Sequence, residues 1–179
     1  DRYLRFGQAA SDAQIGHYVD LIDFSRDEVF GIFNRRLELI AVAHLAYLGD
    51  PPAPGAARIA EFGVSVLPKA RGRGYGSRLF DHSVMHARNR RIDTLVIQAL
   101  SENVAMLKIA RNAGATVERE GPESMARLKL PPEDFVSRVG EIVEDNAAEV
   151  DYRFKVQAQR LDTLLDAISE ANDRIVKSA

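Results

Sequence analysis

Short apolar runs rich in β-forming residues predict three strands in the first part of the chain, at residues 29–33, 37–48 and 58–67. The third run alternates most clearly, because Phe62, Val64 and Val66 are separated by the small residues Gly63 and Ser65. A polar turn at residues 34–36 joins the first two runs, so we expect an antiparallel hairpin there.

Other segments carry the periodicity of amphipathic helices. Ser11 and Gln14 have the spacing of a capping box, which predicts a helix starting at Asp12. Apolar residues three or four apart predict helices over residues 76–90 and 103–112, with a strand at 94–100 between them and short strands at 117–120 and 125–130. This order predicts an α/β fold, a mixed and mostly antiparallel sheet flanked by helices, with one central strand–helix–strand crossover.

The last segment, residues 131–179, has the pattern of a long helix. It begins with Pro131 and Pro132 followed by two acids, which is typical of a helix start. A single helix of this length would be about 60 Å long, whereas a domain of residues 1–130 would be only ~35 Å across. We therefore predict two parts, a domain at 1–130 and a helical tail at 131–179. The tail has heptad spacing from Phe154 on, so we expect a homodimer in which the tails pack against each other as a coiled coil or against the other subunit. The alternative is a break near residues 146–149 that gives two helices folded back on the body.

Composition narrows the class of protein. The chain of 179 residues contains no cysteine, which excludes disulfides, a thiolate nucleophile and a cysteine-bound metal. Its net charge of -2 gives no indication of the basic face that nucleic-acid-binding proteins usually have. No apolar run is long enough to span a bilayer, and the N-terminus has no signal-peptide pattern. We expect a cytoplasmic protein without membrane or nucleic-acid partners.

A glycine-rich loop lies between the third predicted strand and the following helix. Pro68 ends the strand, and glycines follow at Gly72, Gly74 and Gly76. Backbone N–H groups at a helix start, without nearby Cβ atoms, form an anion site that suits a phosphate. The P-loop pattern is absent, and a dinucleotide fingerprint would need a third glycine where Ser77 stands. The alternative to a phosphate site is an ordinary turn.

The loop resembles the acyl-CoA pyrophosphate loop of the GNAT acetyltransferase superfamily, Arg/Gln-x-x-Gly-x-Gly/Ala, at Arg71, Gly74 and Gly76. A second GNAT-like segment follows, in which Asn103 lies just beyond a strand and Gly114 lies eleven residues later. The resemblance covers roughly residues 1–130 and includes the opening segment 1–6. The family's fold normally begins with a further strand and helix before such a segment. We therefore expect that strand to be missing from the sequence given, or another segment to cover the sheet edge.

The resemblance implies transfer of an acetyl group from acetyl-CoA, as co-substrate, to an amine on a small molecule or a protein. Pantetheine would pair with the strand carrying Val64 and Val66, and backbone N–H groups of the loop would hold the pyrophosphate. The predicted cofactor-binding residues are Val64, Val66, Arg71, Gly72, Arg73, Gly74, Tyr75, Gly76, Ser77 and Asn103.

Glu61 is the predicted catalytic residue. An ammonium group must lose a proton before it attacks, and Glu61 stands where several GNAT enzymes carry a general base. The alternative is a carboxylate on a strand surface. His44, in an apolar strand, is more typical of a satisfied core residue. No histidine or carboxylate spacing predicts a metal site.

The position expected for the general acid of the reaction departs from the family pattern. Ala110 stands where many members have a tyrosine that protonates the leaving thiolate. A catalytically silent acyl-CoA-binding sensor or regulatory module is therefore the alternative function. The sequence does not predict which acceptor is used.

Overall fold

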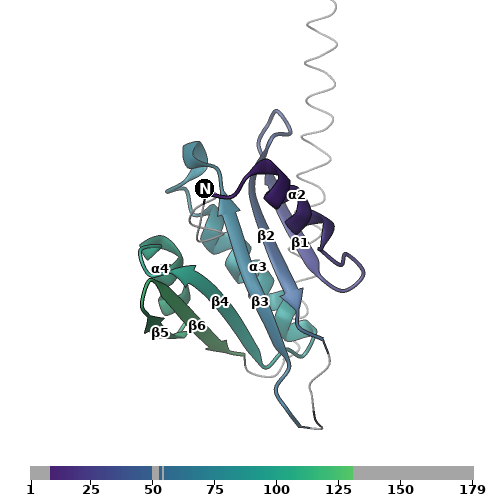
Figure 1. Ribbon diagram of the computed structural model, residues 1–179, viewed down its shortest axis with the longest axis vertical. Helices are drawn as coiled ribbons and strands as arrows, with labels where there is room; N and C mark the ends of the chain where they lie inside the picture. The colour runs from purple at the N-terminus through teal and green to yellow at the C-terminus, as the bar shows by residue number, and fades with distance from the viewer. Residues whose placement is uncertain (1–8, 50–52, 54, 131–179) are drawn as a thin grey trace, which may run out of the picture.

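The computed structural model describes residues 9–49, 53 and 55–130, which form one six-stranded sheet with helices on both faces (Figure 1). The helices are α2 (Asp12–Asp20), α3 (Tyr75–Asn89) and α4 (Val104–Asn112), with a short 3-10 turn, η1 (Pro68–Ala70). The strands are β1 (Glu28–Phe33), β2 (Leu39–Tyr47), β3 (Ile59–Val66), β4 (Thr94–Leu100), β5 (Thr116–Glu120) and β6 (Glu123–Lys129). No described helix is long and apolar enough to cross a membrane.

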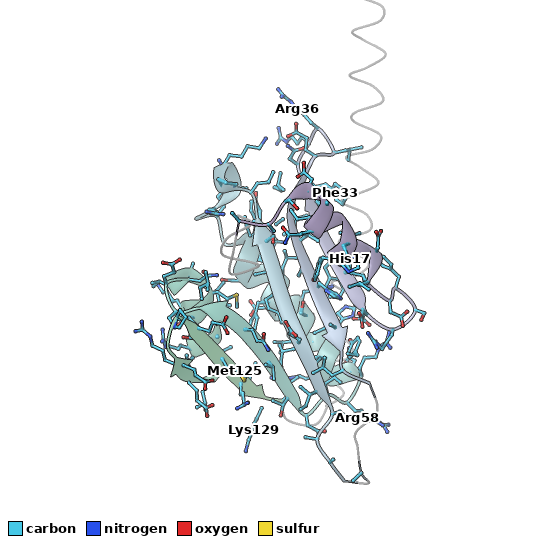
Figure 2. The ribbon with its side chains drawn as sticks, in the orientation of Figure 1. His17, Phe33, Arg36, Arg58, Met125 and Lys129 are labelled. Atoms are coloured by element: carbon cyan, nitrogen blue, oxygen red, sulfur yellow. The ribbon has the colours of Figure 1, made fainter. Side chains whose placement is uncertain are left out.

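The strand order is β1-β2-β3-β4-β6-β5, and every neighbouring pair is antiparallel except β3 and β4. The parallel pair is connected through α3, which is the predicted crossover. Helix α3 packs against β2 and β3 on one face of the sheet. Helix α2, which carries His17, lies over the β1–β2 half of the opposite face, whereas Met125 and Lys129 belong to the β6 half (Figures 1 and 2).

Side-chain alternation along β3 assigns residues to the two faces. Phe62 is buried and meets Phe80 of α3 edge-to-face, with ring centroids 5.1 Å apart. Leu45 of β2 is the cross-strand partner of Phe62, so it lies on the same core face. Glu61 and Gly63 alternate with Phe62 and therefore lie on the opposite face, the one carrying α2.

The elements predicted within the described residues are confirmed, with shifts of one or two residues at their ends. The capping box is present, because the Ser11 hydroxyl accepts from the Gln14 N–H and the Gln14 side chain accepts from the Ser11 N–H. The apolar stripe predicted for this helix is only partly covered: α2 has no buried residue, and Val19 is 46% exposed. The predicted segments 1–6 and 131–179 lie outside the described residues.

Glu28 joins the edge strand β1 to α3. Its carboxylate lies 2.8 Å from the His86 Nδ1 and 2.9 Å from an Arg90 guanidinium nitrogen. Burial raises the pKa of Glu28, but the hydrogen bond from His86 and the positive charges of His86 and Arg90 outweigh it, so the pKa is lowered overall. A carboxyl with a lowered pKa stabilises the fold above its unfolded pKa, and that contribution is lost as the pH falls through the folded pKa.

We expect Glu28→Gln to destabilise the protein at pH 7, by about 2 kcal/mol, because a charge-assisted contact is lost. The deficit should begin to shrink as the pH falls below about 4, where the carboxyl of the unfolded chain takes up a proton, and should disappear only below the lowered pKa of the folded state. Thermal unfolding measured from pH 3 to pH 7 checks this. Glu120→Gln, at an exposed strand position, is the control that should show no such dependence. A deficit that is constant with pH would contradict the ion-pair explanation.

Candidate functional site

The sheet forks between its two central strands. Strands β3 and β4 pair only from Ile59–Thr94 to Glu61–Val96, after which they separate (Figure 1). Strand β3 continues to Val66 and β4 to Leu100. Among the described residues, no strand therefore pairs with the β4-facing edge of β3 beyond Glu61. Val64 and Val66, the predicted pantetheine-binding residues, lie on this unpaired stretch.

Glu61 is located at the last paired position before the fork. It is half-buried, and its side chain makes no hydrogen bond or ion pair with any described residue. The other carboxylates at comparable depth differ, because Asp27 is paired with Arg26 and Glu28 with His86 and Arg90. An unpaired carboxylate on a core strand is unusual unless it meets a ligand or water. This placement fits a proton acceptor at the fork.

The glycine loop turns the chain from β3 into α3. Gly72 and Gly74 have φ angles of 75° and 79°, in the left-handed region that favours glycine. Gly74 is the N-cap of α3, and no side chain caps this helix. The first turn of α3 also contains no acidic residue. The helix start therefore presents backbone N–H groups and positive dipole charge, with no acidic side chain in its own first turn to neutralise them.

Arginines surround this helix start. Arg71, Arg73 and Arg78 are exposed, so each guanidinium is accessible from solvent. The Arg71 Nε donates to the Val66 carbonyl oxygen, 3.2 Å away, and this contact ties the loop to the end of β3. Arg71 thus helps to shape the loop, in addition to the charge it carries. Tyr75 packs against the core and Ser77 is exposed on the first turn.

Gly76 keeps α3 close to the end of β3 and to α4. A Cβ atom at Gly76 would lie 3.4 Å from the Ile109 Cδ1 and 3.9 Å from a Val66 Cγ. The glycine is therefore explained by close packing as well as by the loop motif. A larger side chain here would push α3 away from β3 and α4.

Asn103 caps the second helix of the predicted site. Its side-chain oxygen accepts from the Met106 N–H at 3.2 Å, which makes it the N-cap of α4. Ala110, on the same helix, is fully buried in the core. Ser101, a polar group at the end of β4, bonds to the Ser124 hydroxyl and the Gly121 carbonyl. These contacts give Ser101 a structural role at the β4–β6 junction.

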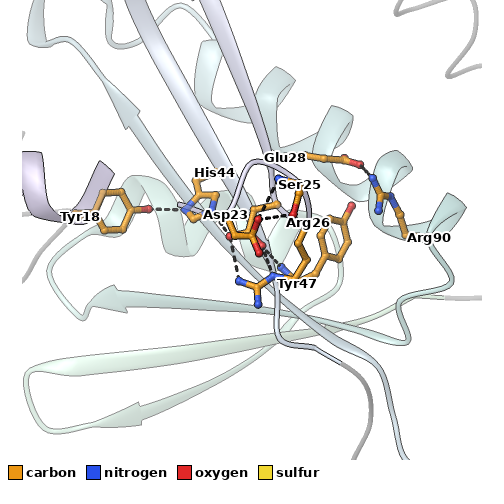
Figure 3. Close-up of polar contacts among 9 residues, drawn as sticks. Tyr18, Asp23, Ser25, Arg26, Glu28, His44, Tyr47 and Arg90 are labelled. Atoms are coloured by element: carbon orange, nitrogen blue, oxygen red, sulfur yellow. Dashed lines mark hydrogen bonds and ion pairs between the residues drawn. The ribbon is translucent and has the colours of Figure 1, made fainter. Parts of the chain in front are cut away.

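A hydrogen-bonded cluster on the α2 face was not predicted from the sequence. The Tyr18 hydroxyl lies 2.6 Å from the His44 Nδ1 (Figure 3). The His44 Nε2 lies 3.2 Å from an Asp27 oxygen. His44 is a satisfied residue, as expected, but its partners come from elements far apart in the sequence. The sequence did contain one indication of such a cluster, because both ring nitrogens of a histidine in an apolar strand need hydrogen-bond partners.

Comparison with known proteins identifies the family. A family model described as the acetyltransferase (GNAT) family matches residues 5–115. The solved GNAT domain of S. lividans PAT is 26% identical, with a TM-score of 0.59, over 72% of this chain and 76% of that one. A search of curated proteins found no match.

Two further solved structures are similar to this chain. A cAMP-binding acyltransferase from Mycobacterium smegmatis is 25% identical with a TM-score of 0.51, over 75% of this chain and 41% of that one. A ribosomal-protein-alanine N-acetyltransferase from Brucella melitensis is 17% identical with a TM-score of 0.55, over 71% and 83% of the two chains. At that identity, the second likeness shows the fold alone.

Proposed function

This chain belongs to the acetyltransferase (GNAT) family and is an acyltransferase, and we propose that it transfers an acetyl group from acetyl-CoA to an amine acceptor. The fork between β3 and β4, with Glu61 at its base, is the observation that carries the proposal. The acceptor class, an amine on a small molecule or a protein, follows from the family.

The residues at the fork and the loop fit acyl-CoA. The unpaired edge of β3 at Val64 and Val66 offers backbone groups to the amides of pantetheine. The uncapped start of α3, with Gly72 and Gly74 in the left-handed region, suits a pyrophosphate. The exposed arginines nearby carry positive charge that complements the negative pyrophosphate. We propose that all the cofactor-binding residues predicted from the sequence belong to this site: Val64, Val66, Arg71, Gly72, Arg73, Gly74, Tyr75, Gly76, Ser77 and Asn103. Acetyl-CoA supplies the acetyl group as a thioester.

Glu61 is proposed as the general base. A lysine-like amine with a pKa of ~10.4 is about three units from neutral pH, so its free-base form costs about 4 kcal/mol at pH 7. A carboxylate whose side chain has no partner among the described residues accepts this proton directly or through water. Ala110 replaces the tyrosine that protonates the leaving thiolate in many family members, so in this proposal CoA leaves as the unprotonated thiolate. A thiol pKa of ~8.5 makes this departure feasible.

The second candidate function is an acyl-CoA-binding sensor without catalysis. The burial of Ala110 at the position of the family's tyrosine favours it. A scan of amine acceptors with a thiol-release assay separates the two functions, using free lysine, polyamines and lysine-containing peptides as probes. Turnover of any amine supports the acetyltransferase, whereas tight acetyl-CoA binding with no turnover supports the sensor.

We also propose that residues 131–179 form a helical tail that makes the protein a homodimer. The heptad spacing after Phe154 supports this. Sedimentation of the full chain should give a dimer, and a version ending at Pro131 should give a monomer. A monomeric full chain at micromolar concentration would refute the dimer.

A further inference from the structure

The Tyr18–His44–Asp27 cluster lies on the α2 face of the sheet, the face that also carries Glu61, and has no role in the proposed chemistry. We propose that the Tyr18 hydroxyl binds the amino group of the acceptor, and that His44 and Asp27 are positioning residues that fix the direction of its proton. This inference rests on the proposed function and adds a recognition site for the amine to it.

The hydrogen bonds determine where each proton lies. A carboxylate only accepts, so the His44 Nε2–H donates to Asp27 across 3.2 Å. The neutral ring then has its lone pair on Nδ1, which accepts the Tyr18 hydroxyl proton across 2.6 Å. Asp27 is buried and receives further hydrogen bonds from Arg26 and from the Tyr47 backbone N–H. Burial raises the pKa of Asp27, but these hydrogen bonds outweigh it and lower the pKa overall, so the carboxylate stays ionised.

The cluster and Glu61 border the same part of β3. His44 faces Gly63 across the β2–β3 pair, and Ala46 faces Glu61. Residues diagonal to each other on neighbouring strands lie about 7–8 Å apart, so His44 and Glu61 are neighbours on one face. Gly63, between them, has no side chain. Tyr18 reaches this place from α2, which has no buried residue and covers the sheet only loosely.

An amine fits the Tyr18 oxygen better than an anion does. A hydroxyl that donates to His44 still accepts hydrogen bonds, and an amine or ammonium group donates them. The titratable or charged groups around His44 are Tyr18 from α2, Arg26 and Asp27 from the loop before β1, and Glu61 from β3. Its direct cross-strand partners, Val29 and Gly63, carry no charge.

The experiment uses the full chain and the best amine from the acceptor scan. Tyr18→Phe removes only the hydroxyl, and we expect the KM for the amine to rise about tenfold or more, as for a lost hydrogen bond to a charged group. The KM for acetyl-CoA should stay unchanged. His44→Gln keeps a donor and an acceptor but lacks the ring that fixes the direction of the Tyr18 proton, so we expect the amine KM to rise while the KM for acetyl-CoA again stays unchanged. His17→Gln, on the same helix but exposed, is the control.

Nitrogen NMR of the His44 ring gives a readout that does not depend on activity, since we expect the Nε2–H tautomer at pH 8. An unchanged amine KM in Tyr18→Phe would overturn the proposal, as would the opposite tautomer. An equal rise of the KM for both substrates in His44→Gln, with lower thermal stability, would assign the cluster a structural role only. If His44→Gln does not fold, Tyr18→Phe alone decides. Absence of turnover by the wild type would instead refute the proposed function and remove the basis of this inference.

Discussion

Gly74→Glu should strongly weaken acetyl-CoA binding while the protein stays folded. Gly74 is the N-cap of α3 at φ 79°, so the new carboxylate would stand at the backbone groups proposed for the pyrophosphate. Each charge-assisted hydrogen bond lost is worth about 1.5–3 kcal/mol. The lost hydrogen bonds and the repulsion between the new carboxylate and the pyrophosphate should together lower the affinity for acetyl-CoA by at least about 100-fold. Titration calorimetry with acetyl-CoA and with CoA measures this.

Gly114→Glu is the matched control for this variant. Gly114 also has a left-handed φ, 88°, and an added Cβ would meet nothing within 4 Å at either glycine. Both variants therefore bear similar backbone strain and the same charge, but only one alters the loop before α3. Equal affinity for CoA in the two folded variants would contradict the proposed site.

Glu61→Gln should lower kcat by about 10²–10⁴-fold near pH 7, the usual contribution of a general base. The amide has the shape of the carboxylate but accepts no proton. The deficit should become smaller at pH 9–10, because more of a lysine-like acceptor amine, with a pKa of ~10.4, is then already neutral. Initial rates across this range, with the amine found in the acceptor scan, check the prediction.

The control for Glu61→Gln is Glu118→Gln. Glu118 lies on the same face of the sheet in β5, where it pairs with Arg127 at 3.3 Å, and its side chain is 66% exposed. This variant should retain wild-type rates. A loss in Glu61→Gln that does not vary with pH would indicate a binding or structural role for Glu61. An unchanged KM for acetyl-CoA in both variants would show that the effect concerns proton transfer.

The sequence by itself determined the local elements and the loop motif. The alternation in β3, the capping box at Ser11 and the glycines after Pro68 are short-range signals, since each depends on backbone preferences within a few residues. Identification of the family from the spacing of Arg71, Gly74 and Gly76 belongs here too, and the family match confirms it.

The tertiary structure decided which residues come together. The fork at Glu61 depends on the position at which β3 and β4 stop pairing. The first residues that pair, Ile59 and Thr94, are 35 positions apart in the sequence, so no local pattern encodes this position. The same holds for His44, whose partners Tyr18 and Asp27 lie 26 and 17 residues away. Sequence periodicity shows which face of a strand a residue occupies, but the partner of a polar group is set by long-range packing. The unpaired Glu61 and the paired His44 therefore became distinguishable only in the folded sheet.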